Sequence, residues 1–118
     1  MSLDVYLYQQ NTCRHCSKNC CDGDLLFEAN ITHNLGKMAS EAGLYSCLWE
    51  PETLGYDRAG MLVDGLHKGL LELHQNPKHF QAMNPSNGWG SYEGLVKFVT
   101  NYLKACEENP DAKITVSR

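Results

Sequence analysis

The chain has 118 residues, which is enough for a single domain, 1–118, with a modest hydrophobic core. Hydrophobic residues make up 42% and charged residues 20%, and no apolar run is long enough to cross a membrane. The net charge is −4 and the 10 basic residues are scattered along the sequence, which disfavours nucleic-acid binding.

Two segments near the N-terminus are predicted to be strands. Residues 3–8 alternate apolar side chains with Asp and Tyr, and residues 25–31 form a second extended, mainly apolar stretch. The segment 9–24 between them is polar, rich in cysteine, and ends in a turn signal. The two strands are therefore predicted to form an antiparallel hairpin with this segment at its tip.

Helical spacing of apolar residues dominates the rest of the chain. We predict helices over residues 35–42, 59–75, 77–83 and 92–108, with 44–49 as a further helical turn. Gly43 is placed to end the first helix and Ser91 to cap the last. Gly60, Gly65 and Gly69 are expected to weaken the propensity of the 59–75 helix by about 1 kcal/mol each relative to alanine. The alternative is that they permit close packing against a neighbouring element. Residues 113–117 alternate again and are predicted to be a final strand.

These elements predict a small α+β domain. The N-terminal hairpin and the C-terminal strand would form a small antiparallel sheet, and three or four helices would cover one of its faces.

The predicted hairpin tip concentrates cysteines. Cys13-x-x-Cys16 places two thiolates within reach of one metal ion, as in zinc knuckles, and Cys20 and Cys21 are candidates for further ligands. Adjacent side chains diverge, so Cys20 and Cys21 fit a single ion poorly. Reduced cysteines without a ligand are an equal alternative. A redox Cys-x-x-Cys pair is a weaker one, because that motif normally opens a helix and this segment is a poor helix start.

The cysteine content also bears on the compartment. The chain has six cysteines, and residues 1–4 show neither the basic region nor the apolar core of a signal peptide. We therefore expect a cytoplasmic protein with thiols or metal thiolates rather than a disulfide framework.

Polar side chains gather where the second predicted strand meets the first predicted helix. Asn30, His33 and Asn34 lie there, where free backbone N–H groups attract anions and a histidine can act as an acid or base. Trp89, in a turn-rich Asn-Gly-Trp-Gly loop, would add an apolar wall if that loop packs nearby. These four residues are the candidate ligand-binding set. The alternative is simple helix capping, with Trp89 in the core.

The register of the hairpin separates the two candidate sites. A turn near residues 16–18 places Tyr8 opposite about Leu26 and Asp4 opposite about Asn30. His33 then lies roughly 23 Å from the tip, at about 3.3 Å per strand residue. A regular hairpin therefore does not bring His33 to the cysteines.

The sequence contains no enzyme motif. Gly-x-Ser-x-Gly, a phosphate-binding Gly-rich loop and His-Glu-x-x-His are all missing. The leading hypothesis is a small soluble accessory or interaction protein, not an enzyme, that binds a protein partner and holds one zinc ion at the Cys-x-x-Cys knuckle. The alternative is a small ligand-binding protein or hydrolase that uses His33 with Asn34 and Trp89.

Several strings of residues after the cysteine loop support a resemblance. They are Ala-Asn-Ile-Thr-His-Asn-Leu at 29–35 with Met-Ala at 38–39, Leu-Trp at 48–49, Asn-Gly-Trp-Gly-Ser-Tyr-Glu at 87–93, and the ending 110–118. Together they resemble a family of small uncharacterised proteins from bacteria and their phages. The resemblance implies no established activity. It does imply a Cys-x-x-Cys near the start, whereas Cys20-Cys21 departs from the family pattern.

Overall fold

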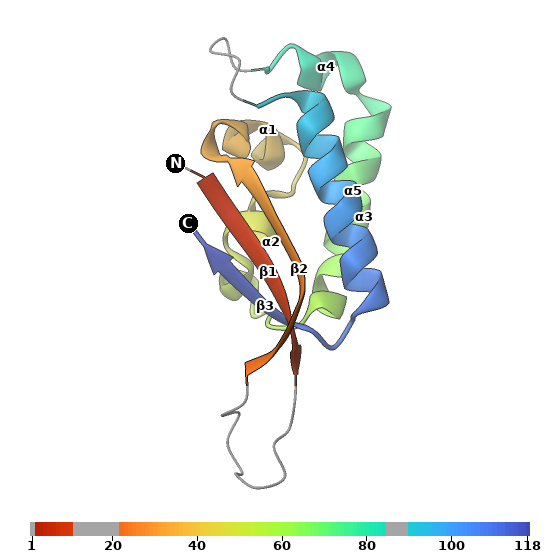
Figure 1. The fold of residues 1–118 in the computed structure, drawn as a ribbon. Helices are drawn as coiled ribbons and strands as arrows, with labels where there is room; N and C mark the ends of the chain where they lie inside the picture. The colour runs from red at the N-terminus through yellow and green to blue at the C-terminus, as the bar shows by residue number, and fades with distance from the viewer. Residues whose placement is uncertain (1, 11–21, 85–89) are drawn as a thin grey trace, which may run out of the picture.

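The computed structural model describes residues 2–10, 22–84 and 90–118 (Figure 1). The strands are β1 (Ser2–Gln10), β2 (Asp22–Thr32) and β3 (Lys113–Ser117). The helices are α1 (Gly36–Glu41), α2 (Tyr45–Trp49), α3 (Ala59–Gln75), α4 (Pro77–Gln81) and α5 (Tyr92–Glu108), with 3-10 helices η1 (His33–Leu35) and η2 (Pro51–Leu54). Within these ranges no helix combines the length and apolar character needed to span a bilayer.

The three strands form one antiparallel sheet in the order β2-β1-β3, with the N-terminal strand in the centre. This arrangement confirms the predicted α+β fold. Asp4 pairs with Asn30, as the register argument predicted, but Tyr8 pairs with Leu25 rather than Leu26. The pairing shifts there because β2 carries one extra residue, which is the signature of a β-bulge.

The helices cover one face of the sheet (Figure 1). Leu3, Val5 and Leu7 of β1 are fully buried on that face, whereas the alternate side chains of β1 point to the other side. α3 and α5 pack side by side, and α5 also packs on β2, where Phe27 stacks on Tyr102 with ring centroids 5.8 Å apart. The core therefore lies between the sheet and the helices, and no described helix covers the opposite face.

The two long helices follow the sequence signals closely. α3 occupies the predicted range, and α5 begins directly after Ser91, whose Oγ accepts a hydrogen bond from the Gly94 N–H at 3.0 Å. The first predicted helix differs, because it opens as the 3-10 helix η1 before α1 begins. Its end was predicted correctly: Gly43 follows α1 with φ +76°, a left-handed conformation that glycine adopts without strain.

α3 makes a close approach to the start of α2 at Gly69. A Cβ added to Gly69 would lie 2.2 Å from Cδ2 and 2.3 Å from Cγ of Leu44, a fully buried side chain. There is no room for a methyl group at these distances. Packing therefore requires a glycine in a helix interior where propensity alone would disfavour it.

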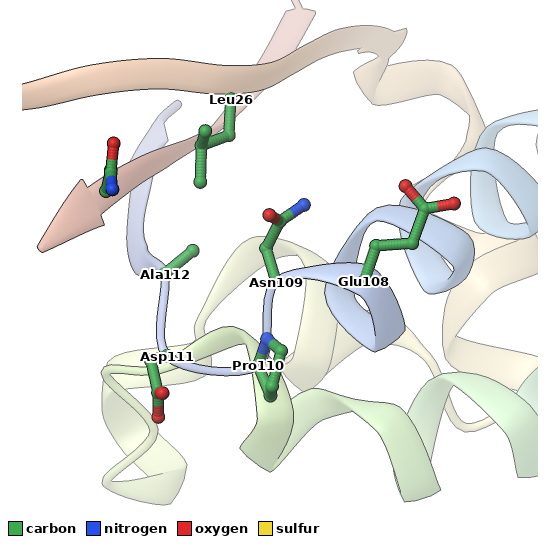
Figure 2. A pocket seen from close by; sticks show the side chains of 7 residues that line it. Leu26, Glu108, Asn109, Pro110, Asp111 and Ala112 are labelled. Carbon is green, nitrogen blue, oxygen red and sulfur yellow. The ribbon is translucent and has the colours of Figure 1, made fainter.

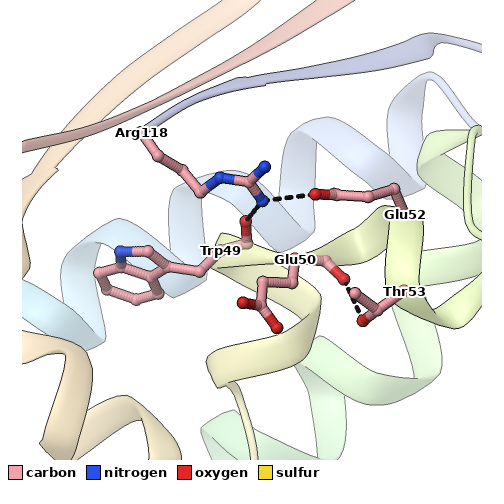
Figure 3. Close-up of polar contacts among 5 residues, drawn as sticks. All are labelled: Trp49, Glu50, Glu52, Thr53 and Arg118. Carbon is pink, nitrogen blue, oxygen red and sulfur yellow. Dashed lines mark hydrogen bonds and ion pairs between the residues drawn. The ribbon is translucent and has the colours of Figure 1, made fainter.

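Arg118, the residue that follows β3, holds the C-terminal end of the strand against the α2–η2 segment (Figure 3). Its Nη1 donates to the Trp49 carbonyl oxygen at 2.7 Å and to the carboxylate of Glu52. The hydrogen bond from Arg118 is the main cause of the lowered pKa of the Glu52 carboxyl group.

The pKa of Glu52 is expected to report this contact. An NMR titration should place the Glu52 pKa below the ordinary glutamate value in the wild type and raise it toward that value in Arg118→Ala. Because the folded-state pKa is lowered, the stabilisation is present above the unfolded-state pKa and is lost as pH falls through the folded-state pKa. Arg118→Ala should therefore lower the melting temperature more at neutral pH than in strong acid. Lys37→Ala is the control, and identical Glu52 titrations in wild type and Arg118→Ala would contradict the contact.

Candidate functional site

The predicted metal ligands Cys13, Cys16, Cys20 and Cys21 lie outside the described residues, so zinc binding there stays a prediction. Across 2–10, 22–84 and 90–118, no three His, Cys, Asp or Glu side chains gather in a way that could hold a metal ion. A metal site built from the described residues alone is therefore not supported.

The two cysteines that the structure describes are core residues. Cys47 and Cys106 are free thiols and both are buried. Burial raises the pKa of both, to about 12 for Cys106. Since the thiolate is the reactive form, neither is suited to redox chemistry or metal binding near neutral pH.

Alkylation should show directly that both thiols are protected in the folded protein. In the folded protein, iodoacetamide is expected to leave Cys47 and Cys106 unmodified, and both should react after unfolding, as read by peptide mass mapping. Ser40→Cys, at an exposed position of α1, is the matched control and should react quickly in the folded state. Rapid alkylation of Cys106 in the folded protein would contradict its burial.

His33 and Trp49 form a hydrogen-bonded pair that joins η1 to α2. Trp49 Nε1 donates to His33 Nδ1 at 3.1 Å, and Tyr45 stacks on the indole with ring centroids 5.3 Å apart. An indole N–H is a donor only, so Nδ1 must carry a lone pair and the imidazole proton sits on Nε2. His33 is therefore a neutral imidazole in this geometry.

The second ring nitrogen of His33 is not accessible. Nε2 is buried and has no hydrogen-bond partner among the described residues. A general acid or base must come within hydrogen-bond reach of the substrate, and a covered atom does not. The geometry favours a structural role, in which His33 accepts the hydrogen bond of a buried tryptophan N–H. The alternative of a ligand site or hydrolase at His33 thus gains no support from the structure.

Asn30 faces away from His33. It lies on the side of the sheet opposite the helices, where its Nδ2 donates to Asp4 Oδ1 at 2.5 Å and to Ser2 Oγ at 2.8 Å. These bonds use its amide to link β2 to β1. The structure therefore does not bring Asn30 and His33 together in one site.

The remaining members of the predicted set have different outcomes. Asn34 is exposed, and its backbone N–H donates to Thr32 Oγ1 at 3.3 Å, which is the capping interaction that the sequence offered as an alternative. Trp89 lies outside the described residues, so its predicted place beside this corner stays a prediction. The next residue, Gly90, does lie here: a Cβ added to it would be 2.6 Å from Thr32 Cγ2 and 2.9 Å from Leu35 Cγ.

The uncovered side of the sheet carries a group of residues that we call the tyrosine face: Asp4, Tyr6, Tyr8, Leu25 and Glu28. The rings of Tyr6 and Tyr8 lie with centroids 6.1 Å apart, Tyr6 pairs with Glu28, and Tyr8 pairs with Leu25, which is 46% exposed. Partial desolvation, followed by the carboxylates of Asp4 and Glu28, raises the pKa of the Tyr6 phenol. Sequence reasoning did not select this face, although the alternation of residues 3–8 contained the signal.

A cleft of about 380 Å³ lies between the hairpin and the α5–β3 connection (Figure 2). Its lining residues are Gln9, Leu26, Glu108, Asn109, Pro110, Asp111 and Ala112. Leu26 is 41% exposed, and among the described lining residues only Glu108 and Asp111 are charged. The cleft therefore suits a basic side chain with an aliphatic stem better than an acidic one.

Comparison with family models, curated proteins and solved structures found no match. The resemblance to the family of small bacterial and phage proteins therefore stays a prediction.

Proposed function

We propose that this chain is a non-enzymatic interaction module that binds a partner protein through the tyrosine face. The supporting observation is that Tyr6 and Tyr8 lie side by side on a sheet face that no described helix covers. Tyrosines held on strands offer a large, amphipathic contact area at low cost in side-chain entropy, and such residues are enriched at protein interfaces.

The charges on this face define the chemistry of the partner. Asp4 and Glu28 flank Tyr6, while Lys113 is paired with Tyr8 and is exposed. The carboxylates repel phosphate groups, so a nucleic acid is a poor occupant. A protein surface that combines arginine or lysine with apolar residues fits best, because a guanidinium group can stack on a tyrosine ring and pair with a neighbouring carboxylate.

The test uses a displayed library of random twelve-residue peptides, selected on the wild-type protein. We expect the selected peptides to be enriched in arginine or lysine next to apolar residues. Binding should weaken at least tenfold in the Tyr6→Ala/Tyr8→Ala double variant, measured by isothermal calorimetry. Binding should also weaken as salt increases, because the charged contacts are exposed.

Matched variants separate a loss of peptide binding from a loss of folding. Leu25→Ala removes an exposed apolar side chain from the face, and Leu71→Ala removes one of similar exposure, 51%, from α3. Leu25→Ala should weaken peptide binding and Leu71→Ala should not, with equal melting temperatures in the two variants. Peptides that bind the wild type and the double tyrosine variant equally well would overturn the proposal.

The zinc ion expected at Cys13 and Cys16 is a separate part of the proposal. One equivalent of zinc in the purified, untagged protein, lost in the Cys13→Ser/Cys16→Ser variant, would support it. No stoichiometric zinc, together with a melting temperature that a chelator leaves unchanged, would remove the metal and leave the proposed protein interface standing.

A further inference from the structure

The outer edge of β2 has no strand beside it in the part of the chain that the structure describes. β2 is hydrogen-bonded to β1 on one side, and its other side is an edge of the sheet. The other edge strand, β3, is partly closed, because the Ile114 N–H donates to the Asp57 carbonyl at 3.1 Å and Arg58 forms a β-bridge with Lys113. The two edges of the sheet are therefore not equivalent.

The segment 27–32 of the free edge lacks the usual protection. Edge strands are normally protected by lysine, proline or bulges, or are kept very short. β2 has eleven residues and contains no lysine, arginine or proline. Its two register shifts lie between Leu7 and Gln10 of β1, and the segment 27–32 pairs with β1 without any shift in register. This segment presents a regular row of backbone N–H and C=O groups that a further strand can use.

We propose that an extended segment of the partner protein, in which basic and apolar residues alternate, adds to the outer edge of β2 as a fourth strand. This inference rests on the proposed function and deepens it by naming how the partner binds. In strand addition, main-chain hydrogen bonds supply affinity and alternate side chains supply specificity.

The charges beside β2 select a basic segment. Glu28 is exposed on the tyrosine face. On the helix side, Leu26 lines a cleft with Glu108 and Asp111, whose carboxylates point away from Leu26 (Figure 2). Because the side chains of a strand alternate between the two faces, the basic side chains of the added strand would lie together on the tyrosine face beside Glu28. Its apolar side chains would then lie on the helix side, beside exposed Leu26.

A second copy of this chain is a poorer occupant of the same edge. Pairing β2 with β2 of another copy would place two strands with carboxylates and no basic residue next to each other. Like charges on neighbouring strands destabilise their pairing. The proposed occupant is therefore a different, basic chain.

The probe is an acetylated and amidated nine-residue peptide of alternating valine and lysine, compared with one of alternating valine and glutamate. The lysine peptide should bind, and hydrogen exchange of alternate amides in 27–32 should slow at least tenfold while β3 amides do not change. Glu28→Lys should weaken binding about tenfold, and Asp64→Lys, a matched charge reversal on exposed α3 surface, should not change it. N-methylation of every peptide bond should abolish binding, because it removes the main-chain donors from both edges of the peptide.

The outcomes separate this inference from the proposed function. Binding that is lost in Tyr6→Ala/Tyr8→Ala but leaves β2 exchange unchanged would overturn strand addition and keep the tyrosine face as the interface. Equal binding of the glutamate peptide, or no binding of the lysine peptide, would also overturn strand addition. A dimer in sedimentation experiments that protects the β2 amides without peptide would show that a second copy is the occupant, and would overturn the inference as well.

Discussion

Trp49→Ala is expected to lower the free energy of unfolding by about 3–5 kcal/mol, the range for truncating a large buried aromatic side chain. Trp49 is 2% exposed, stacks on Tyr45 and donates to His33. The substitution would leave a cavity and an unsatisfied acceptor at His33. With a total stability of about 5–15 kcal/mol for such a domain, the variant would be close to unfolding at 37 °C. Urea denaturation followed by circular dichroism would measure the change.

A conservative variant separates packing from hydrogen bonding. Trp49→Phe keeps much of the apolar volume but removes the N–H, and it should cost about 1–3 kcal/mol. Adding His33→Ala to Trp49→Phe should cost less than His33→Ala costs in the wild type, because the shared hydrogen bond is already lost. A loss below about 1 kcal/mol for Trp49→Ala would contradict the burial described for this residue.

Gly69→Ala is expected to destabilise the protein by about 1–3 kcal/mol, although alanine is the better helix former by about 1 kcal/mol. The reason is the added Cβ, which would fall 2.2 Å from Cδ2 of the buried Leu44. The neighbouring exposed residue Lys68 provides the control, since Lys68→Ala should leave the stability within about 0.5 kcal/mol of the wild type. Thermal and urea unfolding of both variants would measure these changes in stability.

A second substitution tests the cause. Leu44→Ala removes the atoms that the new methyl group would strike, so the double variant Leu44→Ala/Gly69→Ala should be more stable than the sum of the two single changes predicts. The coupling energy should fall in the range of about 0.5–3 kcal/mol that contacting residues show. Strict additivity, or an increase in stability for Gly69→Ala alone, would contradict the close approach.

The parts of the fold that the sequence predicted well depend on local or strictly periodic signals. The alternation in β1, the register of Asp4 with Asn30 and the Ser91 cap were all readable because each rests on spacing or on one side chain near its partner. The predicted partner of Tyr8 was off by one residue, because a bulge leaves no clear mark in the composition of a strand. The 3-10 start of the first helix was missed for the same reason.

The candidate site was harder to predict because its contacts are long-range. Nothing near His33 in the sequence indicates that its partner is Trp49, since the two meet only once η1 has packed on α2. Asn30 and His33 are close in the chain, but the alternation of a strand sends Asn30 to the opposite face. Proximity in sequence was therefore a misleading guide to a shared site. The alternation of residues 3–8 placed Tyr6 and Tyr8 on one face, but only the packing of the helices on the other face showed that this face is uncovered.

The central position of β1 has a kinetic consequence. β1 can pair with β2 as soon as the first third of the chain has been made. Its other neighbour is β3, so the pairing of Asp4 with Ser117 forms only after residue 117 has been made. Contacts between such distant residues raise contact order, which slows folding. During synthesis one edge of β1 would stay unpaired until the last strand leaves the ribosome, and this interval is when the chain is most exposed to aggregation.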